Sequence, residues 1–258
     1  MLNRPAAGRL AAFLLLLVLL ASWEMLARGS RWSALVLPAP SVIWDALWAG
    51  LRSGYFWPHL THTGTELVLG LGLGSAAGFF GGILMAESAF LRRVLYPYVV
   101  VSQVVPKLAL APLFIVWFGF GMTSTVVITA LICFFPLMEN TLTGLQHVEP
   151  RKLELFRMLG AGRAQTLWQL KIPSGLPVIM AGFRVAVVLA LVGAVVGEFI
   201  GGSKGLGALI IASQGMMDTP LMFAVLLLIT VLGLVIYQLA IGLEHLLLWP
   251  HLKENPKD

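Results

Sequence analysis

Long apolar runs with few charged residues dominate this sequence. Of its 258 residues, 59% are hydrophobic and only 11% are charged, whereas soluble domains carry about a quarter charged residues. A helix of about 20 apolar residues can span a bilayer because it satisfies its own backbone hydrogen bonds. Windows of this kind cover residues 9–27, 66–86, 95–118, 124–145, 175–200 and 221–247. We therefore expect an all-α polytopic membrane protein with about six transmembrane helices, forming one domain over residues 1–258.

The first and third windows carry additional signals. Arg4 and Arg9 precede the first window like the charged start of a signal peptide, but no clean cleavage site follows, so we expect a retained helix. In the third window, Pro106 and Pro112 surround Lys107. Because proline removes a backbone donor and clashes with the preceding turn, this span is predicted to be bent or broken.

The basic residues are distributed unevenly about the six windows. Eleven Lys and Arg residues lie on the side that holds both termini, and four lie on the other side. Basic loops are retained in the cytoplasm, so both termini and the segment between the fourth and fifth windows are predicted to be cytoplasmic. The loop LPAPSVIWDALWAGL is then external, and its apolar spacing predicts an amphipathic helix near the membrane surface.

The second window contains a glycine at every fourth position. These residues are Gly70, Gly74, Gly78 and Gly82. A row of small residues on one helix face lets another helix approach closely. Packing within one chain is the expected use of this ridge, with a contact between subunits as the alternative.

Common signatures of nucleotide binding and of zinc-dependent catalysis are absent from the sequence. It contains no G-x-x-x-x-G-K-[ST] or H-E-x-x-H motif, which argues against a nucleotide site and against a zinc-dependent enzyme in this chain. Cys133 is the one cysteine, so no intrachain disulfide forms. His59 and His62 could share a helix face, but a metal site would need further ligands nearby. We expect no cofactor, no metal and no nucleic-acid binding.

Residues 149–174 form a polar interruption between the fourth and fifth windows. Pro150 suits the first turn of a helix, and an apolar stripe of short helical spacing follows it. The stripe consists of Leu153, Phe156 and Leu159. Gly160 permits a sharp turn into a second short helix, which Pro173 is expected to end before the fifth span. The sequence predicts a rigid knob on the cytoplasmic side, with a hairpin lying on lipid headgroups as the alternative.

This segment and its continuation have a distinctive order of Glu, Gly and Pro. The key positions are Glu154, Gly160, Ala161, Pro173, Pro177 and Gly182. They match E-A-A-x-x-x-G-A followed, after a spacer, by L-P-x-x-x-P-x-I-x-x-G, and so resemble the EAA loop of inner-membrane permease subunits of bacterial ABC importers. Leu155 and Phe156 replace the two small residues of the pattern. In that family the loop is a coupling helix, so the resemblance implies that these residues couple the chain to a separate ATPase.

Further matches occur in the same order along about 180 residues of the chain. They are Leu37-Pro38-Ala39-Pro40-Ser41, Ala111-Pro112-Leu113, Trp117-Phe118-Gly119, Phe134-Phe135-Pro136, Asn140-Thr141 and Gly205-Leu206-Gly207. This set resembles the nitrate/sulfonate/taurine branch of the family. It implies the type I ABC importer permease fold, with a core over about residues 60–247 and a cytoplasmic coupling loop at 149–174.

The resemblance also implies a function and partners. A permease of this kind is a multi-pass protein of the bacterial inner membrane and forms the pathway for a small solute that an external binding protein delivers. The expected cargo is nitrate, a sulfonate, taurine or a similar organic solute, with a vitamin precursor such as a pyrimidine or riboflavin as the alternative. The implied partners are two ATPase subunits, which bind the ATP, a periplasmic or lipid-anchored binding protein, and a second permease, expected to be an identical copy.

Charged residues inside the predicted spans are candidates for the pathway, because charge in a bilayer is costly unless it is paired or hydrated. These residues are Glu66, Lys107, Glu139, Arg184 and Glu198. Lys107 and Glu139 are expected to pair with each other, with substrate contact as the alternative. Arg184 is expected to extend to the cytoplasmic interface. Glu198 lies near the external end of its span, where it could shape the mouth or contact the delivering protein.

Two other functions compete with the permease hypothesis. A secondary transporter would need coupling carboxylates deep in the spans, for which Glu66 and Glu139 are the candidates. A membrane scaffold would need no transport partner at all. The segment at 149–174 favours the permease over a secondary transporter, which has no reason to carry a cytoplasmic docking element. The absence of an ATPase or binding-protein gene beside this one would favour the scaffold.

Overall fold

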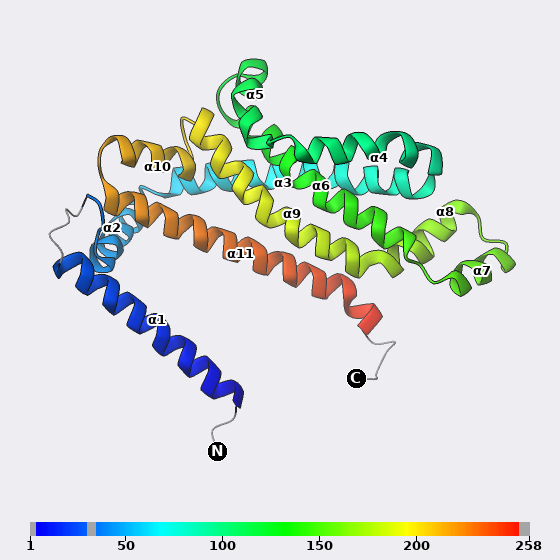
Figure 1. Cartoon of the computed structure of the whole chain (residues 1–258), viewed down its shortest axis with the longest axis horizontal. Coiled ribbons are helices and arrows are strands. Elements are labelled where there is room, and N and C mark those ends of the chain that lie inside the picture. Colours follow the sequence, from blue (N-terminus) through cyan, green and yellow to red (C-terminus); the bar gives the residue numbers. More distant parts are fainter. Residues whose placement is uncertain (1–3, 30–34, 253–258) are drawn as a thin grey trace.

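The computed structural model describes residues 4–29 and 35–252, and the described part contains no β-strand. Its elements are α1 (Arg4–Gly29), α2 (Pro40–Arg52), α3 (Trp57–Glu87), α4 (Ala89–Val104), η1 (Lys107–Leu110), α5 (Ala111–Phe118), α6 (Met122–Gln146), α7 (Pro150–Met158), α8 (Arg163–Thr166), η2 (Leu167–Lys171), α9 (Ile172–Gly201), α10 (Leu206–Gly215) and α11 (Thr219–Leu252). Figure 1 shows α2 and α10 at one end of the molecule and α7 and α8 at the other. Five of the described helices are long and apolar enough to span a membrane, and a bent pair adds a sixth.

The bent pair is the predicted third span. Helix α4 and the segment formed by η1 and α5 meet at 84°. Val105 has extended backbone angles and directly precedes Pro106, as expected from the restriction that proline places on the residue before it. The prediction of a broken span is confirmed.

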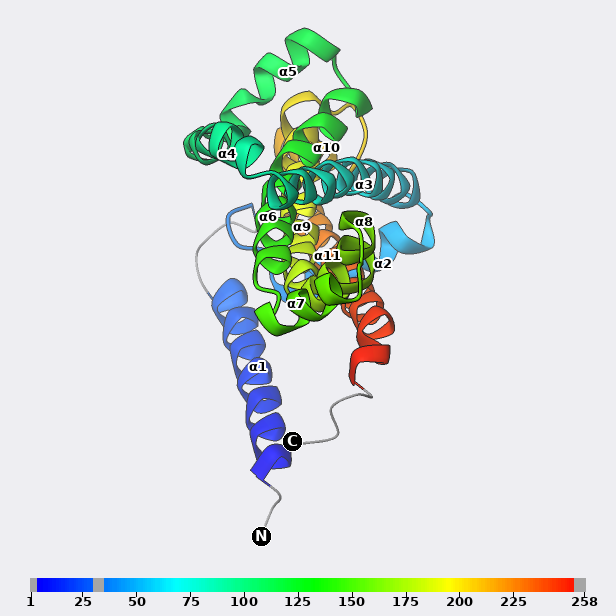
Figure 2. The same ribbon diagram turned by 90° about the vertical axis from the view of Figure 1, so that its right-hand side faces the viewer.

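Helices α3, α6 and α9 form the centre of the fold, as Figure 2 shows from the end of the bundle. The glycine ridge of α3 is buried against α6 of the same chain. A β-carbon at Gly74 would lie 2.5 Å from the carbonyl oxygen of Ala130, and one at Gly78 would lie 2.5 Å from that of Phe134. Only residues without a β-carbon permit this approach, so the prediction of packing within one chain is confirmed.

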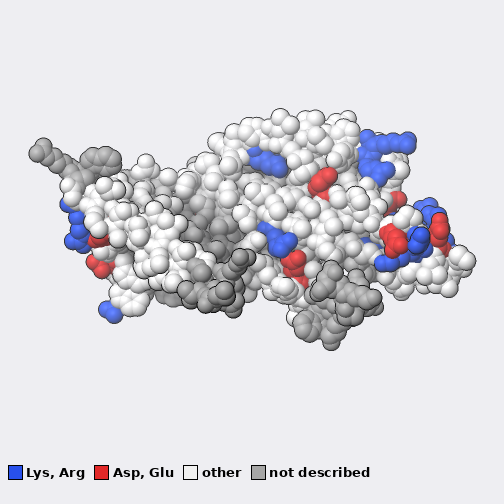
Figure 3. Space-filling view, turned by 60° about the horizontal axis from the view of Figure 1, so that its bottom comes forward, with Lys and Arg blue, Asp and Glu red and all other residues white. Residues whose placement is uncertain are grey.

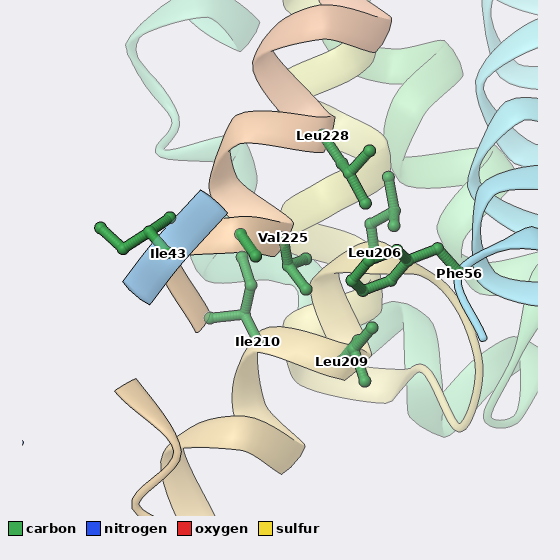
Figure 4. Close-up of a cluster of buried hydrophobic side chains, with 8 residues drawn as sticks. Ile43, Phe56, Leu206, Leu209, Ile210, Val225 and Leu228 are labelled. Atoms are coloured by element: carbon green, nitrogen blue, oxygen red, sulfur yellow. The ribbon is translucent and has the colours of Figure 1, made fainter. Parts of the chain in front are cut away.

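A second apolar cluster holds together the elements at the α2 and α10 end of the molecule. The predicted surface helix forms as α2, with Pro40 in its first turn. Its Ile43 and the following Phe56 pack against Leu206 of α10 and Val225 of α11 (Figure 4). This cluster fixes α2 and α10 against the start of the last span.

Helix α1 diverges from the bundle in both views (Figures 1 and 2). Its contact with the rest of the chain is concentrated at its C-terminal end. There, Ser41 donates hydrogen bonds from its backbone nitrogen and its hydroxyl to the carboxylate of Glu24, and Trp23 lies against Phe223 with ring centroids 6.0 Å apart. The apolar side chains of α1 from Leu10 to Leu20 are exposed, as suits a helix that contacts lipid or another chain.

The fifth span differs from its prediction. Pro173 does not end a surface helix, because α8, η2 and α9 are continuous from Arg163 to Gly201 and form one helix of 39 residues. The backbone nitrogen of Ile172 donates to the carbonyl of Leu167, one residue farther back than in an α-helix. This widened π-type turn directly before Pro173 relieves the clash that a proline ring causes in regular helix.

Candidate functional site

The segment between α6 and α8 is built around a glycine turn. Helix α7 ends in a Schellman motif, in which the backbone nitrogen of Gly160 donates to the carbonyl of Arg157 and that of Ala161 donates to the carbonyl of Phe156, both at 3.0 Å. Gly160 has φ +72°, a conformation that residues with a β-carbon avoid. The turn therefore has a defined shape, and it directs α8 back toward the membrane spans.

Helix α7 presents apolar side chains that no described part of the chain covers. None of its residues is buried, and the exposed fractions are 54% for Leu155 and 85% for Met158, with 73% for the adjoining Leu159. Charged side chains surround them at this end of the molecule, whereas the band between the two ends is mostly uncharged (Figure 3). Large apolar residues in a rim of charges are typical of a surface that binds another protein.

The other side of this segment is anchored to the bundle. The ammonium group of Lys171 lies 2.6 Å from the carboxylate of Glu87 at the end of α3. Leu170 of η2 is buried. These contacts join the exposed knob to the spans that lie behind it.

The first turns of α9 are packed tightly on α6. A β-carbon at Gly175 would lie 2.8 Å from the carbonyl oxygen of Gly144, and one at Gly182 would lie 2.9 Å from that of Pro136 and would overlap the Asn140 side chain. Because backbone atoms of both helices make these contacts, α9 cannot shift here without moving α6.

The structure divides the predicted coupling residues into two groups. Those on α7 and its turn are Glu154, Leu155, Phe156, Gly160 and Ala161, of which Glu154, Leu155 and Gly160 are exposed and Phe156 and Ala161 are half-buried. Those on α9 lie in its first three turns: Pro173, Pro177 and Gly182. Only Gly182 of this second group is buried, and it belongs to the helix contact with α6 rather than to the exposed surface.

The expected pair of Lys107 and Glu139 is wrong. The ammonium group of Lys107 lies 5.7 Å from the ring centroid of Phe135, and the carboxylate of Glu139 accepts a hydrogen bond of 3.3 Å from the hydroxyl of Tyr96. Spacing along the chain could not show this, because the break between α4 and η1 sets the direction of Lys107.

Arg184 also differs from its prediction. Its guanidinium group lies 3.2 Å from the carboxylate of Glu244 on α11, so it forms an ion pair between two spans instead of extending alone to the interface. Sequence reasoning missed Glu244, although a carboxylate at the same depth in a neighbouring span was the available signal.

Glu198 is 1% exposed and therefore does not form a surface at the mouth. Its carboxylate accepts hydrogen bonds of 2.6 Å from the hydroxyl of Thr63 and from the backbone nitrogen of Gly207. Leu206 in turn donates from its backbone nitrogen to the Thr63 hydroxyl at 2.8 Å. Glu198 thus fastens the loop between α9 and α10 to α3, and Glu66, also buried, lies beside it.

The two candidate metal-binding histidines have other partners. His59 forms a hydrogen bond of 3.0 Å with the carbonyl of Gly205, and His62 lies 3.2 Å from the carboxylate of Glu66. Within residues 4–29 and 35–252, no group of three or more His, Cys, Asp and Glu side chains could hold a metal ion.

Comparison with known proteins identifies the family. The family described as "Binding-protein-dependent transport system inner membrane component" matches residues 72–245. The chain is 38% identical over 243 residues to the riboflavin transport system permease protein RibX of Chloroflexus aurantiacus, covering 94% of this chain and 90% of that protein. It is 35% identical to the formylaminopyrimidine transport permease protein ThiX of Halalkalibacterium halodurans, with 91% and 93% covered. Identity to the taurine transport system permease protein TauC of Escherichia coli is 31%, with 90% and 85% covered.

Solved structures agree with this assignment at the level of the fold. An inward-facing structure of the MetNI methionine ABC transporter is similar with a TM-score of 0.64 at 18% identity, covering 74% of this chain and 94% of that chain. A structure of an amino acid ABC transporter with histidines gives a TM-score of 0.61 at 22% identity, with 78% and 96% covered. The chain therefore belongs to the family of binding-protein-dependent transport system inner membrane components, and it is a multi-pass permease subunit of an ABC importer, a class that works with an ATPase and a solute-binding protein.

Proposed function

We propose that α7 and its glycine turn are the surface through which a cytoplasmic ATPase drives this permease. The observation that carries this proposal is the set of uncovered apolar side chains on a rigid, anchored knob at the end of the molecule. Such a surface gains free energy by packing into a groove of a partner. The chain itself hydrolyses no ATP under this proposal; Glu154 to Ala161 contact the partner, and Pro173 to Gly182 transmit its movement.

The test is to uncouple transport from ATP hydrolysis in the purified complex. Glu154→Ala and Gly160→Val should each lower uptake per ATP hydrolysed, because the first removes a charge from the docking surface and the second distorts the turn. Matched controls lie near α2, at the opposite end of the molecule (Figure 1). Asp45→Ala removes an exposed carboxylate from α2, and Gly54→Val replaces another glycine with positive φ, +77°. Unchanged coupling in both α7 variants would refute the assignment.

We also propose the arrangement of the complex. The excess of Lys and Arg on one side supports cytoplasmic termini and a cytoplasmic α7. Side chains and glycine contacts fill the space between α3, α6 and α9, so the solute pathway has to lie on an outer face that a second permease covers. Two identical permeases of one domain each, two ATPases and one external binding protein account for these features.

For the cargo, we propose a small organic solute that carries oxygen acceptors. The proteins to which this chain is similar are named for riboflavin, formylaminopyrimidine and taurine. These compounds share carbonyl or sulfonyl oxygens. Sequence identity is higher to the two permeases named for heterocyclic compounds, at 38% and 35%, than to the permease named for taurine, at 31%. The partner binding protein provides the test, since its melting temperature should rise with riboflavin or a formylaminopyrimidine. A rise with nitrate alone would refute this cargo class.

A further inference from the structure

The broken third span places a positive charge at the middle depth of the membrane. Lys107 is the first residue of η1, directly after the break. Its ammonium group lies over the ring of Phe135, which is near the middle of α6. Phe135 is 13 residues after Met122, where α6 begins, and 11 residues before Gln146, where it ends. At about 1.5 Å per residue, this depth is roughly 16 to 20 Å from either end of the span.

Lys107 has no carboxylate partner at this depth. Among the described residues, the ion pairs that span the bundle join other groups, and Glu139 is bonded to Tyr96 instead. A lysine side chain is too short to reach either interface from here. Because an unpaired charge in hydrocarbon is strongly unfavourable, the ammonium group has to face water or a polar ligand.

A cavity lies directly at this position. It has a volume of about 220 Å³ and lies between α4, the break, α5 and α6. Apolar and aromatic side chains, among them Phe114 and Phe134, form most of its wall, and Ser102 and Lys107 are its polar residues. An apolar pocket with a few convergent polar groups is the usual form of a small-molecule site, and a discontinuous helix at mid-depth is a common place for one in transporters.

We propose that this cavity is part of the solute pathway and that Lys107 binds an oxygen acceptor of the passing solute. The ammonium group donates to a sulfonyl, carboxylate or carbonyl oxygen, while the aromatic wall packs against the apolar body of the solute. The inference rests on the proposed permease function and adds a selectivity rule to it. Anionic and carbonyl-rich solutes are favoured, and cations are repelled by the fixed positive charge.

The experiment uses the assembled complex and two charged thiol reagents of similar size. Ser102→Cys in a Cys133→Ser background places a reactive thiol in the cavity wall. Sulfonatoethyl methanethiosulfonate is the anionic probe and trimethylammonioethyl methanethiosulfonate is the cationic probe. Each rate is divided by the rate of the same reagent with a free thiol, and we expect this normalised rate to be higher for the anionic probe than for the cationic one. Lys107→Met should lower the ratio of the two normalised rates about tenfold or more, since one nearby charge in a site of low dielectric contributes at least that factor. Lys107→Arg should keep the preference.

Two results would overturn the proposal. A thiol at position 102 that reacts with neither reagent means that the cavity faces lipid and not the pathway. A preference that is the same in the Ser102→Cys, Cys133→Ser protein with and without Lys107→Met means that Lys107 does not set the charge selectivity. If Lys107→Met fails to assemble with the ATPase, Lys107→Gln replaces it, because it removes the charge and keeps a polar side chain. Neither result depends on the α7 variants, so failure here and failure of the ATPase-coupling proposal are separable.

Discussion

Replacing Gly182 by alanine tests whether α9 and α6 move as one unit. The added β-carbon would lie 2.9 Å from the carbonyl oxygen of Pro136 and 2.9 Å from Cγ of Asn140. Favourable contacts between heavy atoms require about 3.5 Å, so the two helices have to separate by roughly half an ångström or more. The Pro136 oxygen cannot give way alone, because it belongs to the backbone of α6 and also accepts a hydrogen bond from Asn140.

The expected cost is modest in stability and large in transport. Overpacking of a tight interior typically costs about 1–3 kcal/mol, and the higher helix propensity of alanine returns up to about 1 kcal/mol. Gly182→Ala should therefore lower the free energy of unfolding by up to about 2 kcal/mol. Unfolding is measured in detergent micelles by denaturant titration. Uptake is measured in proteoliposomes that contain the ATPase, and it should fall further than the loss of folded protein explains.

The matched control is Gly72→Ala on α3. No heavy atom lies within 4 Å of a β-carbon at Gly72, so this variant should be neutral or slightly more stable. If the two variants unfold at the same denaturant concentration and transport equally well, the close contact at Gly182 does not exist in the working protein. The argument that α9 carries movement into α6 would then be wrong.

Three further predictions concern Glu198, the pair of Arg184 and Glu244, and Cys133. Glu198→Ala leaves the Gly207 backbone donor and the Thr63 hydroxyl without their acceptor. It should lower the free energy of unfolding by about 2–4 kcal/mol and make the loop before α10 sensitive to added protease. A loop that stays as resistant as in the wild type would contradict this role of Glu198. A double-mutant cycle with Arg184→Met and Glu244→Gln, measured on the free energy of unfolding, should give a coupling free energy of about 0.5–1.5 kcal/mol for the pair at 3.2 Å. If the effects of the two single substitutions add up to that of the double variant, no pair forms. Cys133 is 0% exposed, so a charged thiol reagent should modify it only after unfolding, and rapid labelling of the folded complex would refute its burial.

Hydropathy and local rules account for the features that depend on neighbouring residues in the chain. The apolar windows locate the spans because a bilayer imposes a length and a composition. Pro106 locates the break, and Gly160 locates the turn after α7, since each acts on the backbone beside it. The ridge that includes Gly74 predicts a close helix contact for the same reason, although it does not identify α6 as the partner.

The residues that were predicted incorrectly depend on which spans are neighbours. Arg184 pairs with Glu244 because α9 and α11 are adjacent, and hydropathy does not contain that information. Glu198 lies close to an end of its span, but the loop after α9 folds back and buries it against Thr63. Pro173 was expected to end a helix, and a single π-type turn before it allowed the helix to continue.

The unbroken fifth span connects the proposed coupling surface on α7 to the cavity at Lys107 through direct contacts. Helix α9 with α8 and η2 has 39 residues, or about 58 Å at the normal rise, roughly twice the hydrocarbon thickness of a bilayer. Because the helix is continuous through the π-type turn, we expect a displacement beside α7 to reach Gly182 as a movement of the whole helix. Gly182 touches the carbonyl of Pro136 on α6, and the preceding residue, Phe135, lies under the ammonium group of Lys107. We infer that movement of the knob changes the cavity around Lys107 through this contact, so that ATPase closure and solute affinity are coupled by one pair of helices.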